Sequence, residues 1–220
     1  MTFQELKIAS YLMNVVSNGD RNYDALSNRN LDLNSKDDTK QLLTFLNAWG
    51  CRQFIKEQHS QTGKHLKSWF NKFESSLPPH SASLINHSNR KIALYSDMFD
   101  VLMNSRASIN KTEVNKNVGP VGAAKALFAL RRNVFPPWDN PIADHLGFSK
   151  NGTGYTEYLM YVRDEILKLK GECAKLKIDL NDIPRIFKRP NVTLVKLIDE
   201  YLWLTITRAF DPKAIIDLIK

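Results

Sequence analysis

The sequence predicts an all-α protein, and two observations support this class. Apolar residues recur every three or four positions along most of the chain, which is the period of helices that bury one face. No run of alternating apolar and polar residues flanked by hairpin turns indicates β-strands. A chain of 220 residues can bury a full core. We therefore expect one helical domain over residues 1–220, with two lobes around a cleft.

Helices are expected along most of the N-terminal half. Thr2 and Glu5 form a capping-box pattern at the start of a helix that should run to Ser17. Residues 19–34 show no sustained period, so they are expected to form a long connection. Ser35 is suited to cap the next helix, because acidic residues follow it in the first turn. Further helical stripes cover residues 35–55, 66–73 and 81–104.

The middle of the chain contains a turn with two glycines and a loop with adjacent prolines. Residues 108–117 are expected to form a short polar turn or helix, and a small-residue helix should begin at Gly122. The prolines prevent residues 133–138 from being helical throughout. Asp139 stands where an N-cap is expected, with Pro141 in the first turn of a short helix.

Three more helices are expected in the C-terminal part. A flexible loop over residues 149–154 should lead into a long helix over 155–176. Residues 192–210 form the most apolar stripe and are expected in the core. Asp211 and Pro212 begin a short terminal helix.

Composition limits the classes of partner. The formal net charge is +8, which favours a polyanion such as nucleic acid or a membrane surface, although many basic proteins bind neither. Cys51 and Cys173 are too few for a disulfide framework, and no disulfide partner is expected. The histidines lack ligand spacing, so we expect no metal and no cofactor. No signal peptide or membrane span is visible, which favours the cytoplasm, or the nucleoid or nucleus if the protein binds DNA.

One stretch resembles a known family. Val118-Gly119-Pro120-Val121-Gly122-Ala123-Ala124-Lys125-Ala126 resembles the hairpin of helix-hairpin-helix DNA glycosylases, the endonuclease III-like superfamily. In that family a helix and a loop follow, and the loop ends in an apolar residue and an aspartate that begins the next helix. Phe135-Pro136-Pro137-Trp138-Asp139-Asn140-Pro141-Ile142 has this form. The hairpin would span about residues 110–132, and the carboxylate loop 133–141.

The resemblance implies roles for particular residues. Gly119, Val121 and Gly122 would grip a DNA phosphate through backbone amides, and Asp139 would be the catalytic carboxylate. Ala124 occupies the place of the nucleophilic lysine of bifunctional members, so only the monofunctional reaction is implied.

The match to the family is incomplete. The hairpin has an extra residue between its glycines. The step from Gly122 to Asp139 is 17 positions (139 − 122) and is somewhat short. The cysteine cluster of iron–sulfur members is absent.

Other candidates come from chemistry, and each has a structural alternative. Lys125 and Arg131 are candidate phosphate contacts, although Lys125 could face solvent and Arg131 could end a helix. Trp138, Trp49 and Tyr155 are candidates for stacking on a flipped base, although aromatic residues in helical proteins more often fill the core. Asp139 could act only as a helix cap.

Three functions follow from these observations. The first is a DNA-binding glycosylase-like protein that excises a damaged or modified base through Asp139. The second keeps the fold and DNA binding without catalysis, and it expects no pocket beside Asp139. The third is a helical interaction protein whose hairpin pattern is accidental.

Overall fold

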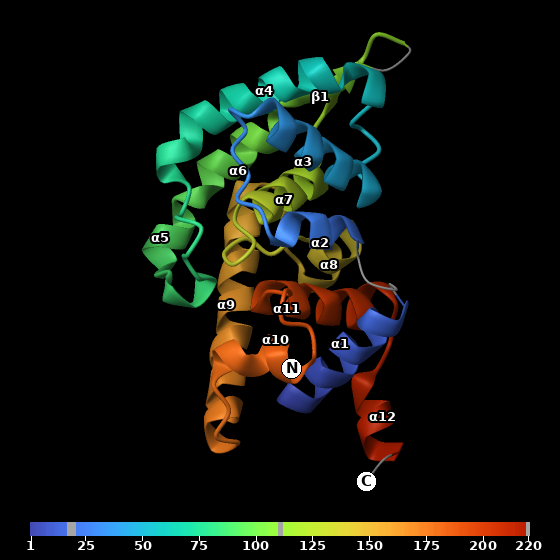
Figure 1. Cartoon of the computed structure of the whole chain (residues 1–220), viewed down its shortest axis with the longest axis vertical. Coiled ribbons are helices and arrows are strands. Elements are labelled where there is room, and N and C mark those ends of the chain that lie inside the picture. Colours follow the sequence, from blue (N-terminus) through green and yellow to red (C-terminus); the bar gives the residue numbers. More distant parts are fainter. Residues whose placement is uncertain (17–20, 110–111, 219–220) are drawn as a thin grey trace.

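The fold is described by a computed structural model that covers residues 1–16, 21–109 and 112–218. Its regular structure is almost entirely helical, which confirms the predicted all-α class (Figure 1). The α-helices are α1 (Phe3–Val16), α2 (Arg21–Ser27), α3 (Lys36–Ala48), α4 (His59–Phe73), α5 (Asn89–Ala93), α6 (Tyr95–Asn104), α7 (Gly119–Leu130), α8 (Asn140–Leu146), α9 (Gly152–Lys175), α10 (Ile183–Ile186), α11 (Leu194–Leu202) and α12 (Pro212–Leu218). A short antiparallel pair, β1 (Arg106–Ile109) and β2 (Asn115–Asn117), lies between α6 and α7.

Short turns complete the described chain. One-turn 3₁₀ segments cover Lys56–Gln58, Glu74–Ser76, Leu84–Asn86 and Leu180–Asp182, and a π-helical turn covers Trp203–Thr207. The π-helical turn continues α11, so the apolar stripe predicted over residues 192–210 contains an α-helix followed by a wider turn.

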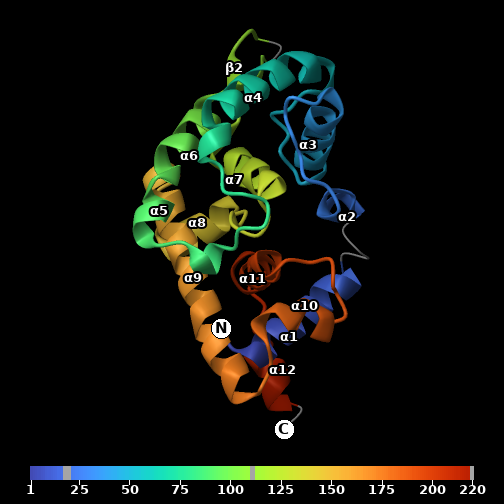
Figure 2. The same cartoon turned by 60° about the vertical axis from the view of Figure 1, so that its left-hand side comes forward.

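The long helix α9 runs along the molecule and carries two groups of helices (Figures 1 and 2). One end holds α3, α4, α6 and α7, and the other holds α1, α10, α11 and α12. Helix α6 packs against α7 and α9, while α1 packs against α11 and α12. The first described helix therefore completes the same group as the last ones, although they are far apart in sequence.

Several helix ends match the sequence patterns. The Ser35 side chain accepts a hydrogen bond from the Asp38 amide at 3.3 Å, as expected of an N-cap. Asn151 caps α9 by accepting from the Gly154 amide at 3.0 Å. This helix begins at Gly152, inside the loop that was predicted over residues 149–154.

Close packing explains the glycines at the start of α9. A Cβ at Gly154 would lie 1.9 Å from the Ser149 carbonyl oxygen, and one at Gly152 would lie 2.2 Å from the Ser96 carbonyl oxygen. These glycines permit contact with neighbouring backbone. The prediction of a flexible loop was therefore wrong for residues 152–154, which start α9, while residues 149–151 lie outside the helix.

Two predicted segments need correction. The connection predicted over residues 19–34 contains α2, whose Tyr23 and Leu26 are buried in the core; residues 19 and 20 lie outside the described chain. The single helical stripe over residues 81–104 is divided into α5 and α6. Its regular helix begins only after Ser88, which caps α5 by accepting from the Lys91 amide.

The segment before the glycine turn is also corrected. A short polar turn or helix was predicted over residues 108–117, but Arg106–Ile109 and Asn115–Asn117 pair as β1 and β2, with Arg106 opposite Asn117; residues 110 and 111 lie outside the described chain. The Gln58 side chain completes the edge of β1, because it accepts from the Ile109 amide and donates to the Ile109 carbonyl, both at 2.7 Å. These contacts come from a distant part of the chain, so local periodicity could not reveal them.

A buried histidine makes the stability of the fold depend on pH. His87 Nδ1 lies 2.9 Å from the Ser83 carbonyl oxygen and must donate to it, while Nε2 is buried without a hydrogen-bond partner among the described residues. Burial lowers the pKa of His87. The ring is therefore more easily protonated in the unfolded chain than in the folded one.

We expect the free energy of unfolding to fall as the pH drops below about 6.5, the ordinary histidine pKa. The stabilisation is complete above that unfolded pKa and is lost as pH falls towards the lower folded pKa. Urea titrations across this range would measure the change. His87→Asn keeps a donor for Ser83 and should reduce the slope with pH. An unchanged slope in this variant would assign the effect to other groups.

Candidate functional site

A pocket of about 260 Å³ lies where α1, the end of α3, α7, α8 and α11 meet. Its walls combine aromatic and charged side chains. They comprise Met13, Trp49, Lys125, Pro137, Trp138, Asp139, Ile142, Lys196, Asp199, Glu200 and Trp203. Four candidate residues from the sequence analysis thus lie together with residues of α11; they are Trp49, Lys125, Trp138 and Asp139.

Asp139 is held in one orientation at the pocket wall. Its Oδ1 accepts a hydrogen bond from the Ile142 amide at 2.9 Å, which confirms the predicted N-cap of α8. The Thr207 hydroxyl lies 3.0 Å from Oδ2 and 3.3 Å from Oδ1. The carboxylate is half-buried and lines the pocket, so capping and exposure to a ligand coexist.

Trp49 contributes an aromatic wall that is already packed on the protein. Its ring stacks on Phe128, with 5.5 Å between centroids, and contacts Phe45 at 4.4 Å. The Lys196 ammonium lies 4.5 Å from the Trp49 ring centroid, a cation–π distance. Trp49 remains a pocket residue, but these neighbours reduce the ring surface available for stacking.

Lys125 points towards the pocket. Its Nζ donates to the Trp49 carbonyl oxygen at 2.6 Å and lies 5.9 Å from the Trp49 ring centroid. Its predicted phosphate contact stays a prediction. Lys125 ties α7 to the end of α3 and places an amine in the same pocket as Asp139.

The other two aromatic candidates are mainly core residues. Trp138 is 1% exposed, and its Nε1 donates to the Pro120 carbonyl at 3.2 Å. Tyr155 is fully buried, stacks on Phe99 and donates to the Pro136 carbonyl at 3.0 Å. Tyr155 does not line the pocket, so its proposed role in a base pocket is corrected; Trp138 forms part of the wall.

The glycine turn begins α7 three residues earlier than predicted, at Gly119. Gly119 has a φ of +69°, a conformation that favours glycine. Gly122 is buried: a Cβ there would lie 2.7 Å from Gln53 Nε2 and 3.1 Å from Val118 Cγ1. Protein atoms therefore occupy the space beside the Gly122 Cα, and its predicted phosphate contact through the backbone amide stays a prediction. Gly119 and Val121 are half-exposed, and their predicted role stays a prediction.

Arg131 serves the fold instead of a ligand. The side chain is buried, with Nε donating to the Pro78 carbonyl and Nη1 donating to the Leu130 carbonyl at 2.7 Å. These bonds satisfy a guanidinium that has lost its contact with water. The expectation that Arg131 binds phosphate was therefore wrong.

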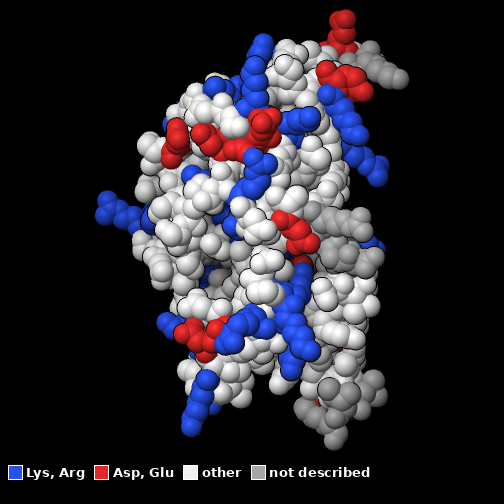
Figure 3. Space-filling view, in the orientation of Figure 1, with Lys and Arg blue, Asp and Glu red and all other residues white. Residues whose placement is uncertain are grey.

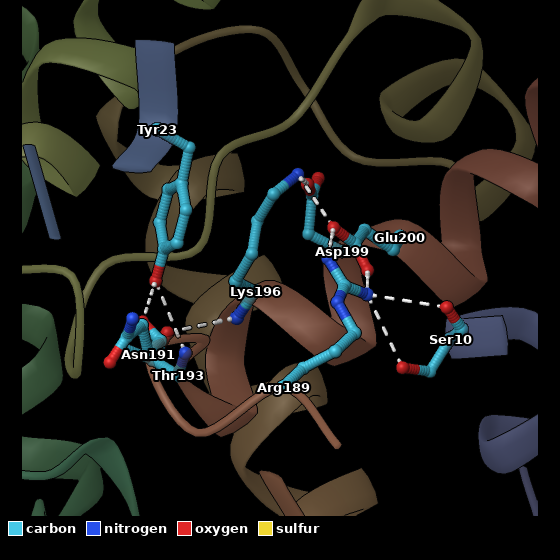
Figure 4. Close-up of polar contacts among 8 residues, drawn as sticks. All are labelled: Ser10, Tyr23, Arg189, Asn191, Thr193, Lys196, Asp199 and Glu200. Carbon is cyan, nitrogen blue, oxygen red and sulfur yellow. Dashed lines mark hydrogen bonds and ion pairs between the residues drawn. The ribbon is translucent and has the colours of Figure 1, made fainter. Parts of the chain in front are cut away.

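The pocket also contains charged residues that the sequence reading missed. Lys196, Asp199 and Glu200 lie on α11, and each is buried. Lys196 Nζ lies 2.9 Å from Asp199 Oδ2 and 3.6 Å from Glu200 Oε1 (Figure 4). The sequence held one signal for this cluster: Asp199 and Glu200 follow Lys196 by three and four positions within the most apolar helix. This spacing puts the three charges on one face of the helix.

Arg189 completes this buried cluster from the segment before α11. Its guanidinium binds the Glu200 carboxylate through two contacts, Nη1–Oε2 at 2.5 Å and Nη2–Oε1 at 2.9 Å. Nη1 also reaches the Ser10 hydroxyl on α1 at 3.2 Å (Figure 4). The cluster thereby joins α1 to the wall of the pocket.

Asp199 is one of the two buried acidic groups of this cluster. Burial raises its pKa, and the neighbouring Lys196 opposes this shift. Oδ2 accepts the Lys196 hydrogen bond, and no group among the described residues donates to Oδ1. Asp199 can therefore offer a hydrogen-bond acceptor to a ligand in the pocket.

The pocket is mixed in charge. Lys125 and Lys196 provide two cations, and Asp139, Asp199 and Glu200 provide three acidic groups. On the face seen in Figure 3, basic side chains are dispersed among acidic ones and form no continuous stripe. The net positive charge therefore does not concentrate at this pocket.

Comparison of the chain with protein-family models, curated proteins and solved structures gives no significant match. Within the described residues, no cluster of three or more His, Cys, Asp or Glu side chains could hold a metal ion. None of the described helices is both long and apolar enough to cross a membrane.

Replacing Arg189 by Met should destabilise the protein by about 3–5 kcal/mol, because Glu200 would remain buried without its main partner. Urea unfolding would measure the loss. The double variant Arg189→Met/Glu200→Gln should recover much of it, since the buried charge is removed as well. If the single and double variants are equally destabilised, packing and not charge dominates this site.

Proposed function

We propose that this protein binds duplex DNA and releases a single base through a monofunctional glycosylase reaction. The observation that carries the proposal is that Asp139, at the position of the family's catalytic carboxylate, lines a pocket with Trp49, Trp203 and Asp199. A base must leave the helical stack before its sugar–base bond can be reached, and such a base needs a pocket of this kind.

The size and walls of the pocket suit a small planar ligand. Its volume of about 260 Å³ lies just below the range of roughly 300–1,000 Å³ typical of drug-sized ligands. Tryptophan side chains provide apolar walls. Asp199 would accept from a ring N–H, and Lys196 would donate to a neighbouring carbonyl oxygen. We infer preference for a base that presents an N–H group beside a carbonyl.

The chemistry requires charge stabilisation at the sugar. As the bond between C1′ and the base nitrogen breaks, its electron pair leaves with the base and the sugar becomes oxocarbenium-like. The Asp139 carboxylate would stabilise that positive charge or activate the water that adds to C1′. The proton lost by the water balances the charge of the departing base. Thr207 is a positioning residue, because it acts by holding Asp139.

Binding without catalysis is the competing function. That alternative expected no pocket beside Asp139, whereas the structure has one. The incomplete hairpin pattern and the burial of Gly122 weaken the case for the phosphate grip, which both functions need, so they do not separate the two. The third function is an interaction protein without DNA binding. Such a protein would not bind duplex DNA even at low salt, where phosphate contacts are strongest.

Asp139→Asn should abolish base release, with a loss of at least about 100-fold in rate, because a neutral amide cannot balance the developing charge. A panel of duplexes with different damaged bases would be assayed for release, and binding would be measured in parallel. Binding should survive. Asp144→Asn is the matched control, since Asp144 is an exposed acid on the same helix that pairs with Lys150. Unchanged release by Asp139→Asn would refute the catalytic role.

We expect no covalent protein–DNA adduct when the reaction is run with borohydride. An adduct requires a lysine amine to attack C1′ and form an imine that borohydride reduces. The nitrogens of Lys125 and Lys196 are engaged by the Trp49 carbonyl and by Asp199. Gel electrophoresis would detect a trapped complex. Trapping that disappears in Lys125→Gln or Lys196→Gln would instead assign a lysine nucleophile to the pocket.

A further inference from the structure

The π-helical turn after α11 places three side chains in or beside the pocket at Asp139. The turn covers Trp203–Thr207 and is closed by the Arg208 amide, which donates to the Trp203 carbonyl at 3.1 Å. Trp203 lines the pocket at one end of the turn, and Thr207 holds Asp139 at the other end. Arg208 follows Thr207 directly, so its backbone lies one residue from the group that positions the carboxylate.

Arg208 stacks on a part of the Trp203 ring that is turned away from the pocket. Its guanidinium lies 4.4 Å from the ring centroid, a cation–π distance. Trp203 lines the pocket whereas Arg208 does not, so the guanidinium covers the ring from outside. The Arg208 side chain is exposed and forms no ion pair within the described chain. Stacking uses the face of the guanidinium and leaves its N–H edge open to a ligand.

The backbone after Arg208 is held in an unusual conformation. Ala209 has a φ of +50°, a region that residues with a Cβ rarely adopt. The next amide, of Phe210, donates to the Leu204 carbonyl at 3.0 Å and ties the strained residue back to the turn. Such a conformation persists only where surrounding contacts hold it, and it is frequent at ligand sites. The turn therefore presents Arg208 from a defined position beside the pocket.

A nucleotide whose base enters the pocket would need a cation outside it. The phosphates of that nucleotide stay on the strand, so they lie beside the pocket and not in it. Inside the pocket, Lys125 donates to the Trp49 carbonyl and Lys196 to Asp199, so both ammonium groups already bond to the protein. Arg208 has the required place and charge, because it is exposed next to the pocket wall.

We propose that Arg208 binds a phosphate of the DNA strand next to the nucleotide whose base enters the pocket. The guanidinium would donate two N–H groups to phosphate oxygens while it stays stacked on Trp203. The inference rests on the proposed function, since it takes DNA as the ligand, but it concerns binding and not base release. The competing role is purely structural: Arg208 would only shield the Trp203 ring, and its charge would not affect affinity for DNA.

The test measures, by fluorescence anisotropy over a range of salt concentrations, the binding of a duplex of about 20 base pairs. The duplex carries one tetrahydrofuran abasic-site analogue at its centre, so binding does not depend on which base is released. Arg208→Gln removes the charge, and Arg208→Lys keeps it. Arg90→Gln is the matched control, because Arg90 is an exposed arginine on α5, which does not line the pocket.

A second set of duplexes locates the phosphate. In each, one phosphate flanking the abasic-site analogue is replaced by a neutral methylphosphonate. If Arg208 contacts that phosphate, the replacement should weaken binding of the wild type but not of Arg208→Gln, because the contact is already lost in the variant.

We expect Arg208→Gln to weaken binding about five- to tenfold at low salt and to reduce the slope of log affinity against log salt by about one. Arg208→Lys and Arg90→Gln should change both quantities much less. At one flanking position, the methylphosphonate should affect the wild type alone. Far-ultraviolet circular dichroism would verify that each variant is folded.

Two results would overturn the proposal, whether or not the protein releases a base. One is an equal loss of affinity in Arg208→Gln and Arg90→Gln. The other is a methylphosphonate effect that is the same in the wild type and Arg208→Gln at every flanking position. If the coupling is present but no damaged duplex loses a base, the assignment of Arg208 stands and only the glycosylase reaction is refuted.

Discussion

Burial of charge on α11 is the constraint on which the pocket depends. Lys196, Asp199 and Glu200 lose most of their contact with water, which is costly unless each finds a partner. Lys196 and Asp199 pair with each other, while Arg189, from the preceding segment, supplies the partner of Glu200 and also reaches α1 through Ser10. The same contacts that offset the burial of charge therefore hold α1 against α11 and set one wall of the pocket.

Asp139 and Lys125 show how one residue can serve both fold and site. Asp139 caps α8 and is held by Thr207 from the π-helical turn after α11, so its position depends on both segments. Lys125 similarly bonds to the backbone at the end of α3 while its amine lines the pocket. A pocket built from groups with structural bonds is preorganised, because those bonds exist before any ligand arrives.

Net charge is a poor guide to the location of a site in this protein. The charge of +8 favoured a polyanion partner, yet the pocket at Asp139 contains more acidic than basic groups. A concentrated positive lining lies instead in a groove between α3 and α4, which is lined by Lys36, Lys40, Lys56, Lys64 and Lys67. Arg131, which looked like a phosphate ligand, is satisfied by carbonyl groups inside the fold. Only the tertiary partners of each cation distinguish these cases.

The sequence by itself determined the helical class, most helix positions and the cap at Asp139, because these depend on periodicity and on contacts within a few residues. It also indicated the carboxylate that lines the pocket. Tertiary structure decided the rest: the strands around residues 106–117, the burial of Gly122 and Tyr155, and the assembly of α11 charges beside Trp49. Each of these depends on groups tens of residues away, and such contacts leave no local pattern.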